Sequence, residues 1–296
     1  MVPCREKNRH TGIILLVVSL ALVALGLLGF ILWRHMQESL PEQPSTGTEP
    51  PETTLQTQPP TETTEPTTAP TESPIPLTDL TAADFGYVDG IFTCLTWDCV
   101  MGIDVSKYQE NVDWAQVKAA GYDFVMIRVG YRGYGKTGSL QPDEWAPVHY
   151  KGAKEAGLQV GAYFFSQAVS VEEAREEALY ALERIKDWEL DLPLVYDGEY
   201  IEYGRAAEVD TDTLTACAIA FCQEVSDVGI RTMIYVSPWF GNLHLDQLEE
   251  YPQWLARYTD VLDYPYRFEM WQYTSSGSVP GVNGDCDINI LFPYDW

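Results

Sequence analysis

The chain has 296 residues, of which 18 are basic and 44 acidic, so its formal net charge is −26. This excess of negative charge argues against binding of nucleic acid or of anionic lipid by the folded part. With only four histidines, and neither a His-rich tract nor a Cys-x-x-Cys pair, the chain offers no zinc site of the His-rich or Cys-x-x-Cys type. We therefore expect neither a metal site nor a cofactor.

An apolar run near the N-terminus predicts export. Residues 13–33 carry no charge and are long enough to cross a bilayer as a helix, which we place at residues 13–34. Arg5, Lys7 and Arg9 precede it, which puts residues 1–12 in the cytoplasm. A cleaved signal peptide is the alternative, but the run is longer than usual and no clear cleavage site follows. We favour a single-pass membrane anchor with the folded domain outside the cell.

The next segment, residues 35–77, is dominated by Pro, Thr, Glu, Gln and Ser. Such a composition lacks the apolar side chains that would offset the entropy lost on ordering, so we expect a disordered linker. In a polyproline-like state this linker would reach on the order of 100 Å. It would serve as a stalk between the membrane and the domain.

The cysteines outside the N-terminal tail give no firm disulfide. Cys94 and Cys99 could close a small loop, and the sequence leaves open whether they do. Cys217 and Cys222 are five residues apart in a helical pattern, where their side chains diverge, so we expect buried thiols. Cys286 is expected to pack beside a strand.

From about residue 101, strands alternate with amphipathic helices. Helices are predicted over residues 114–120, 145–156, 171–187 and 213–228. The apolar runs that predict strands are M-G-I-D-V, F-V-M-I-R-V, Q-V-G-A-Y-F-F, L-P-L-V-Y, T-M-I-Y-V, W-L-A-R-Y, F-E-M-W-Q-Y and C-D-I-N-I.

The ends of these helices carry recognisable signals. Asp113 and Asp212 are placed as N-caps. Gly121, Gly157 and Gly229 each follow a predicted helix, where a left-handed residue commonly ends it.

Eight strands, with helices between the early ones, predict an α/β fold of the TIM-like barrel type. The later connections are too short for full helices, so we expect the last third of the barrel to be irregular. A doubly wound open sheet is the alternative. In either fold the active site forms at the carboxyl ends of the strands.

Acidic residues stand at several of those strand ends. Asp197 and Glu199 are two apart in L-P-L-V-Y-D-G-E-Y, so in a strand they point to the same face. Asp104 ends the first predicted strand, and Asp287 lies in the last. Two like charges side by side raise one pKa, which suits a proton donor beside a stabilising anion. That pair is what cleavage of a glycosidic bond requires.

Aromatic residues near the strand ends are the candidate sugar-binding groups. Flat rings stack on sugar faces, although for any single ring packing in the core is the simpler explanation. The candidates are Tyr108, Tyr163, Tyr196, Tyr235, Trp271 and Tyr273.

Residues 130–137, G-Y-R-G-Y-G-K-T, match the phosphate-loop pattern G-x-x-x-x-G-K-[ST]. A working phosphate loop continues directly into a helix, whereas Gly138 and Pro142 oppose a helix here. We therefore expect no nucleotide binding. No G-x-S-x-G nucleophile elbow occurs either, so a serine hydrolase lacks support.

Several of these segments together resemble glycoside hydrolase family 25, the Chalaropsis-type lysozymes or N-acetylmuramidases. The resemblance covers about residues 101–292. It is carried by G-I-D-V-S-K-Y-Q, V-D-W-A-Q-V-K-A-A-G, F-V-M-I-R, A-G-L-Q-V-G-A-Y-F-F-S, L-P-L-V-Y-D-G-E, I-Y-V-S-P and W-Q-Y-T-S-S-G-S-V-P-G-V-N-G-D-C-D-I-N.

The resemblance implies an irregular (β/α)5(β)3 barrel that cuts the β-1,4 bond between N-acetylmuramic acid and N-acetylglucosamine in bacterial peptidoglycan. It implies that Glu199 is the general acid and that Asp197 orients or stabilises the reacting sugar. Asp104 and Asp287 would complete the acidic cluster. Whether the nucleophile is an enzyme group or the acetamido oxygen of the substrate stays open.

The resemblance also sets the expected domain limits. Residues 101–296 would be the catalytic domain, acting as a monomer on glycan strands, and residues 78–100 an N-terminal extension packed on the barrel. The middle residue of D-x-E, usually larger and apolar in the family, is Gly198 here. This difference is the one hint of an alternative, a wall-binding module that has lost turnover. A third reading is an enzyme acting on another exported glycan.

Overall fold

The computed structural model describes residues 77–88, 90–237 and 243–293, all within one compact unit, Thr68–Trp296. The anchor predicted over residues 13–34 lies outside the described residues, as does the stalk except for Leu77. Within the described ranges, no helix is both long and apolar enough to span a bilayer.

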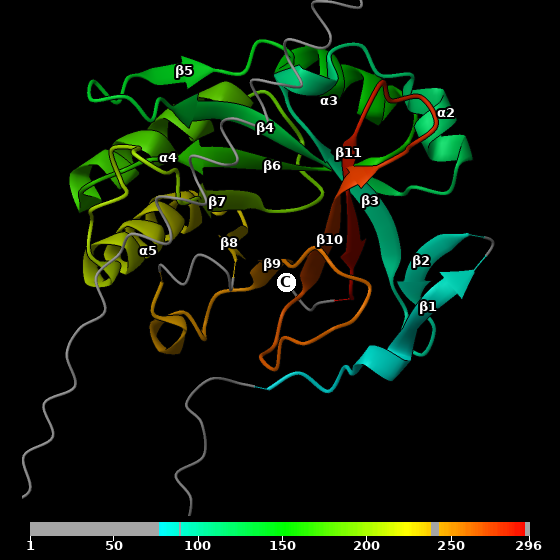
Figure 1. Ribbon diagram of the computed structural model, residues 1–296. Helices are drawn as coiled ribbons and strands as arrows, with labels where there is room; N and C mark the ends of the chain where they lie inside the picture. The colour runs from blue at the N-terminus through cyan, green and yellow to red at the C-terminus, as the bar shows by residue number, and fades with distance from the viewer. Residues whose placement is uncertain (1–76, 89, 238–242, 294–296) are drawn as a thin grey trace, which may run out of the picture. The chain divides into compact units, whose positions relative to one another are not determined.

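A ring of strands forms the centre of the molecule (Figure 1). The strands pair in the order β3-β11-β10-β9-β8-β7-β6-β4, and pairing of β3 with β4 closes the ring. All pairs in the ring are parallel except those made by β11, which is antiparallel to β10 and β3. The strands are β3 (Val100–Val105), β4 (Phe124–Arg132), β6 (Gln159–Ser166), β7 (Leu194–Gly198), β8 (Thr232–Val236), β9 (Gln253–Ala256), β10 (Met270–Gly277) and β11 (Cys286–Leu291). The predicted barrel is confirmed, and the open sheet is excluded.

Helices cover only the first part of the barrel, as the connection lengths predict. The helices are α2 (Trp114–Ala119), α3 (Ala146–Glu155), α4 (Val171–Ile185) and α5 (Thr211–Asp227). They connect β3, β4, β6, β7 and β8 in turn. In the described residues after β8, the only helical element is the single 3₁₀ turn η4 (Leu245–Gln247).

The predicted helix ends are confirmed with one exception. Asp113 caps α2 by accepting a hydrogen bond from the Gln116 amide at 3.1 Å. The glycines after α2, α3 and α5 have φ of 93°, 76° and 79°. The prediction for Asp212 is wrong: Asp210 caps α5, accepting from the Thr213 amide at 2.8 Å, and Asp212 lies in the first turn. Either acid could have capped the helix, and α5 begins earlier than predicted.

The segment that matches the phosphate-loop pattern runs from the end of β4 into a turn. Gly130 pairs with Pro142 of β5 (Leu140–Pro142), and Arg132 pairs with Leu140. The two strands are antiparallel, so a strand rather than a helix follows the turn. The segment therefore lacks the helix N-terminus that holds phosphates in a phosphate loop.

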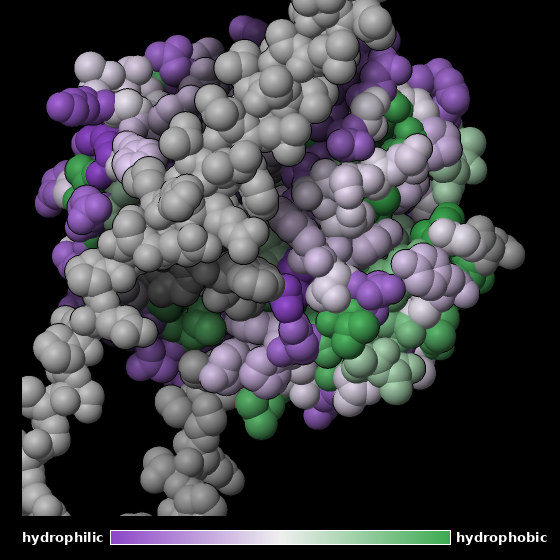
Figure 2. Space-filling model, viewed as in Figure 1, coloured by the Kyte–Doolittle hydropathy of each residue, from purple (hydrophilic) through white to green (hydrophobic). Residues whose placement is uncertain are grey.

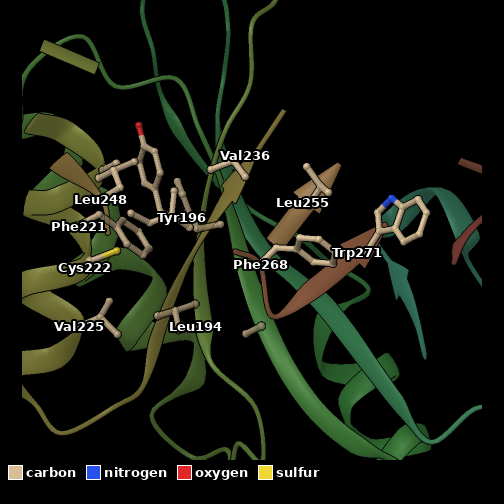
Figure 3. Packing of buried hydrophobic residues seen from close by; sticks show 14 of the residues in the cluster. Leu194, Tyr196, Phe221, Cys222, Val225, Val236, Leu248, Leu255, Phe268 and Trp271 are labelled. Carbon is tan, nitrogen blue, oxygen red and sulfur yellow. The ribbon is translucent and has the colours of Figure 1, made fainter. Parts of the chain in front are cut away.

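Apolar side chains fill both the inside of the barrel and the space between its strands and the helices. The interior cluster includes Phe124, Val195, Met233 and Trp254. On the other face of β7, Leu194 and Tyr196 pack against Phe221, Cys222 and Val225 of α5 (Figure 3). Burying one such large side chain contributes about 1.5–3 kcal/mol. Because side chains alternate between the two faces of a strand, every second residue faces the interior of the barrel.

The N-terminal extension packs on the barrel, as expected. It forms a hairpin of β1 (Phe85–Val88) and β2 (Ile91–Cys94) after the 3₁₀ turn η1 (Ala82–Asp84). The ring of Phe85 meets the indole of Trp271 edge to face, with ring centres 4.9 Å apart. Cys94 and Cys99 are free thiols, so the small disulfide loop does not form.

Candidate active site

The predicted acids meet inside the barrel mouth. Asp104 of β3 and Asp287 of β11 are direct partners in the antiparallel ladder, so their side chains share a face. Asp197 lies near the carboxyl end of β7, and Glu199 directly follows that strand. Beyond the effect of burial, the charge of Glu199 raises the pKa of Asp104, Asp197 and Asp287. Strands distant in sequence thus build one carboxylate cluster.

Asp104 is held by a chain of buried amides. Its Oδ2 accepts hydrogen bonds from Gln272 Nε2 at 2.7 Å and from Asn289 Nδ2 at 2.9 Å. Asn289 in turn accepts from the indole N–H of Trp254 at 2.8 Å. Gln272 accepts from the hydroxyl of Tyr235 at 2.7 Å. The carboxyl of Asp104 is therefore fixed in position before any substrate arrives.

Burial raises the pKa of each acid in the cluster. The pKa of Asp104 is well above its usual value because of burial and then the charge of Asp287, although the two amides oppose the shift. Burial, followed by the charges of Glu199 and Asp104, raises the pKa of Asp197 likewise. For Asp287, burial and the charge of Glu199 raise the pKa to about 6. The cluster therefore retains protons at pH values where isolated carboxyls have lost them.

Asp197 and Glu199 form the most closely linked pair. Burial raises the pKa of Glu199, while a hydrogen bond from Asp197 and the charge of Arg128 oppose the shift. A proton bound between two such carboxyls belongs to the pair rather than to one residue. Asp197 is almost completely buried, and its Oδ1 has no hydrogen-bond partner among the described residues. Glu199 is half-buried, so it is the member of the pair that a ligand can reach.

Arg128 of β4 is a cation beside this cluster that the sequence reasoning missed. Its charge opposes the raised pKa of both Asp197 and Glu199. It is held by Asp143, to which its Nε donates at 2.9 Å, and its guanidinium lies 5.3 Å from the ring centre of Tyr108. The available signal was a charged residue inside the apolar strand F-V-M-I-R-V, two positions after the interior Met126.

Gln167 positions the backbone of the catalytic segment. Its Nε2 donates to the carbonyl oxygen of Glu199 at 2.6 Å, and the side chain is 1% exposed. The loop behind it is held by Arg205, which donates to the Gln167 carbonyl at 3.1 Å and forms a salt bridge with Glu173. These buried contacts tie the segment after β7 to α4.

The aromatic candidates divide between the two faces of the strands. Tyr163 and Tyr235 belong to the interior cluster, and the acids raise the pKa of both beyond the effect of burial. Tyr108 is exposed beside Arg128. Tyr258, which was not predicted, donates its hydroxyl to Gln272 at 3.0 Å and is half-exposed. The sequence could have indicated Tyr258, because it continues the pattern in which every second residue, Trp254 and then Ala256, faces the interior.

The other aromatic candidates lie away from the acids. Tyr196 packs against Phe221, with ring centres 5.4 Å apart (Figure 3). Trp271 is fully buried against the N-terminal hairpin, and Tyr273 lies beside Phe92, with ring centres 4.9 Å apart. Each of these residues is the direct neighbour of Asp197 or of Gln272 along its strand. Because Asp197 and Gln272 point inward, their neighbours face outward. Tyr196, Trp271 and Tyr273 therefore face away from the acids, and their role in binding substrate stays a prediction.

Metal binding has no support within the described ranges. No group of His, Cys, Asp and Glu there has the arrangement that could hold a metal ion.

Comparison with known proteins identifies the family of this chain. The family model for glycosyl hydrolases family 25 matches residues 103–282, more than half of the chain. The chain belongs to this family. It is therefore a glycoside hydrolase, and the matched residues include Asp104, Asp197 and Glu199.

Family 25 relatives are distant in sequence. The autolytic lysozyme of Clostridium acetobutylicum is 28% identical over 64% of this chain and 54% of its own length. The protein YegX of Escherichia coli K12, which is uncharacterized, is 28% identical over 65% of this chain and 69% of its own.

Solved structures of similar proteins share the fold. The autolysin LytC of Streptococcus pneumoniae has a TM-score of 0.59 at 24% identity, covering 70% of this chain and 52% of its own, so this chain spans about half of that protein. The lysozyme of Aspergillus fumigatus has a TM-score of 0.53 at 26% identity, covering 64% of this chain and 93% of its own.

Gly198, the departure from the family 25 D-x-E pattern, has a local explanation. A Cβ at this position would lie 2.7 Å from the ring of Tyr196, closer than real Cβ contacts allow. Tyr196 faces α5, so the missing side chain points away from the acids. Glycine here accommodates the ring of Tyr196 and leaves the carboxylate cluster unchanged.

Proposed function

We propose that the domain hydrolyses the β-1,4 bond between N-acetylmuramic acid and N-acetylglucosamine in peptidoglycan. The observation that carries this proposal is the cluster of Asp104, Asp197, Glu199 and Asp287, whose pKa values burial raises. Glycosidic cleavage needs a carboxylic acid that is still protonated near neutral pH, with anions beside it. Lysozymes among the relatives support the choice of substrate.

In this mechanism Glu199 protonates the leaving oxygen. It is the half-buried member of the Asp197–Glu199 pair, so a sugar oxygen can reach it. As the bond breaks, positive charge develops on the sugar ring. Asp104 and Asp287 then stabilise that charge, and Asp197 orients the sugar through its free Oδ1. Proton transfer of this kind contributes about 10²–10⁴-fold to the rate.

The test compares Glu199→Gln with Glu202→Gln, a substitution of an exposed glutamate three residues later. We expect Glu199→Gln to lower the release of reducing ends from purified peptidoglycan at least about 100-fold. The control variant should retain the activity of the unaltered protein. Equal activity of the two variants would remove Glu199 from its role. Muramic acid at the new reducing ends supports the proposed bond, and glucosamine there contradicts it.

We also propose that the protein is a monomer held at the cell surface by residues 13–34. The charge-free run 13–33 and the basic residues before it support this placement. After cell fractionation, the full chain should stay in the membrane pellet after carbonate washing. Added protease should release the catalytic domain from intact, wall-stripped cells. Recovery in the washed supernatant would contradict the anchor.

A further inference from the structure

The N-terminal hairpin forms one wall of a groove beside the acids. The groove has a volume of about 520 Å³, which is typical of ligand sites. Its lining comes from the hairpin (Tyr87, Gly90, Ile91, Phe92), the segment after β9 (Tyr258, Thr259, Asp260), β10 and the residues after it (Tyr273 to Ser278), and from Tyr122 and Ile288. The family match begins at residue 103, so the hairpin lies outside the matched range.

The hairpin is firmly attached but leaves its tip exposed. Phe92 packs against Trp271, with ring centres 5.7 Å apart, and against Tyr273. Near the turn, Tyr87 is 65% exposed, Val88 50% and Ile91 38%. Hydrophobic side chains gather over this part of the surface in Figure 2. Folding alone does not explain an apolar tip that the fold leaves uncovered, whereas a ligand in the groove would cover it.

Tyr258 connects the groove to the carboxylate cluster. It lines the groove, and its hydroxyl donates to Gln272, which donates to Asp104. The charge of Asp287 also raises its pKa, after the effect of burial. Tyr258 therefore belongs both to the lining of the groove and to the hydrogen-bonded network that holds Asp104.

We propose that this groove binds the part of a glycan strand that extends beyond the bond being cut. The proposal rests on the proposed function, because a polymer cleaved at the acids must leave the cluster in both directions. The rings of Tyr87, Tyr258 and Tyr273 offer apolar surfaces for sugar rings. Hydroxyls of Thr274, Ser276 and their neighbours match the polar edges of sugars.

The charge of the groove also favours a neutral ligand. Its lining contains Asp260 and neither lysine nor arginine, so an anionic polymer would find no counter-charge there. A stretch of uncharged sugar rings fits both the aromatic and the hydroxyl-bearing surfaces.

Binding to the full chain carrying Glu199→Gln, which holds substrate without cutting it, tests the proposal. The ligands are peptide-free oligomers of alternating N-acetylmuramic acid and N-acetylglucosamine, four and eight sugars long, in which each lactyl carboxyl is converted to an uncharged amide. Binding is measured by calorimetry. We expect the longer oligomer to bind about ten-fold more tightly, as one additional stacking contact would give. Adding Tyr87→Ala or Ile91→Ser should remove this advantage and leave binding of the four-sugar oligomer unchanged.

The matched control is Leu179→Ser on α4, a similarly exposed aliphatic residue remote from the groove lining. It should keep the ten-fold difference. Equal affinity for both lengths, or an advantage that survives Tyr87→Ala and Ile91→Ser, overturns the proposal. A length effect seen only when stem peptides are attached would assign the groove to peptide instead. Absence of cleavage by the unaltered protein would refute the proposed function, while these affinities test the groove independently.

Discussion

Asp287→Asn should make the protein more stable at neutral pH while removing most of its activity. Burial and the charge of Glu199 raise the pKa of Asp287 from 3.8 to about 6. Between these pH values the folded protein binds the proton that the unfolded chain has released. The free energy of unfolding therefore falls as pH rises from about 4 through 6. The difference in pKa corresponds to a loss of about 3 kcal/mol.

Asparagine has nearly the same shape as aspartate but cannot ionise, so it avoids this loss. We expect the variant to gain about 2–3 kcal/mol over the unaltered protein at pH 7.5 and little at pH 4. Removing the charge also relieves Asp104, whose pKa Asp287 raises. Urea unfolding of both proteins at the two pH values measures the difference.

The matched control is Asp285→Asn, two residues earlier and exposed to solvent. It should leave the dependence of stability on pH unchanged. If Asp287→Asn gives the same shift at pH 4 and pH 7.5, or destabilises the protein at both, the argument from burial and charge fails. If activity persists together with the gain in stability, Asp287 has no part in the chemistry.

Other outcomes follow from the same contacts. Peptidoglycan release should be faster at pH 5 than at pH 8, because Glu199 must hold a proton to act as the acid and burial raises its pKa. Gln167→Ala should lower kcat about ten-fold with little change in KM, since it frees the Glu199 carbonyl; an unchanged kcat would contradict this. Arg132→Met should cost about 3–5 kcal/mol in urea unfolding at pH 8, because it leaves buried Glu177 unpaired. The cost should be smaller at pH 5, since burial raises the pKa of Glu177 to about 7. Tyr196→Phe should keep kcat/KM within about two-fold, since the ring packs on α5.

Local patterns in the sequence determined the barrel and most of its acids. Asp197 and Glu199 share a face because strand side chains alternate, which needs no knowledge of neighbouring strands. The glycines after α2, α3 and α5 end their helices for an equally local reason. The same local rules left Asp210 and Asp212 indistinguishable as caps, and either could begin a helix.

Only the closed barrel decided which residues surround those acids. Insertion of antiparallel β11 between β3 and β10 sets Asp287 opposite Asp104 and brings Asn289 and Gln272 to the same carboxylate. Pairing between distant strands depends on how the ring closes, and no window of the sequence contains that information. The phase of alternation also turned Trp271 outward, where the hairpin covers it. The acidic residues could therefore be predicted from the sequence, whereas the residues that surround them were determined by strand pairing.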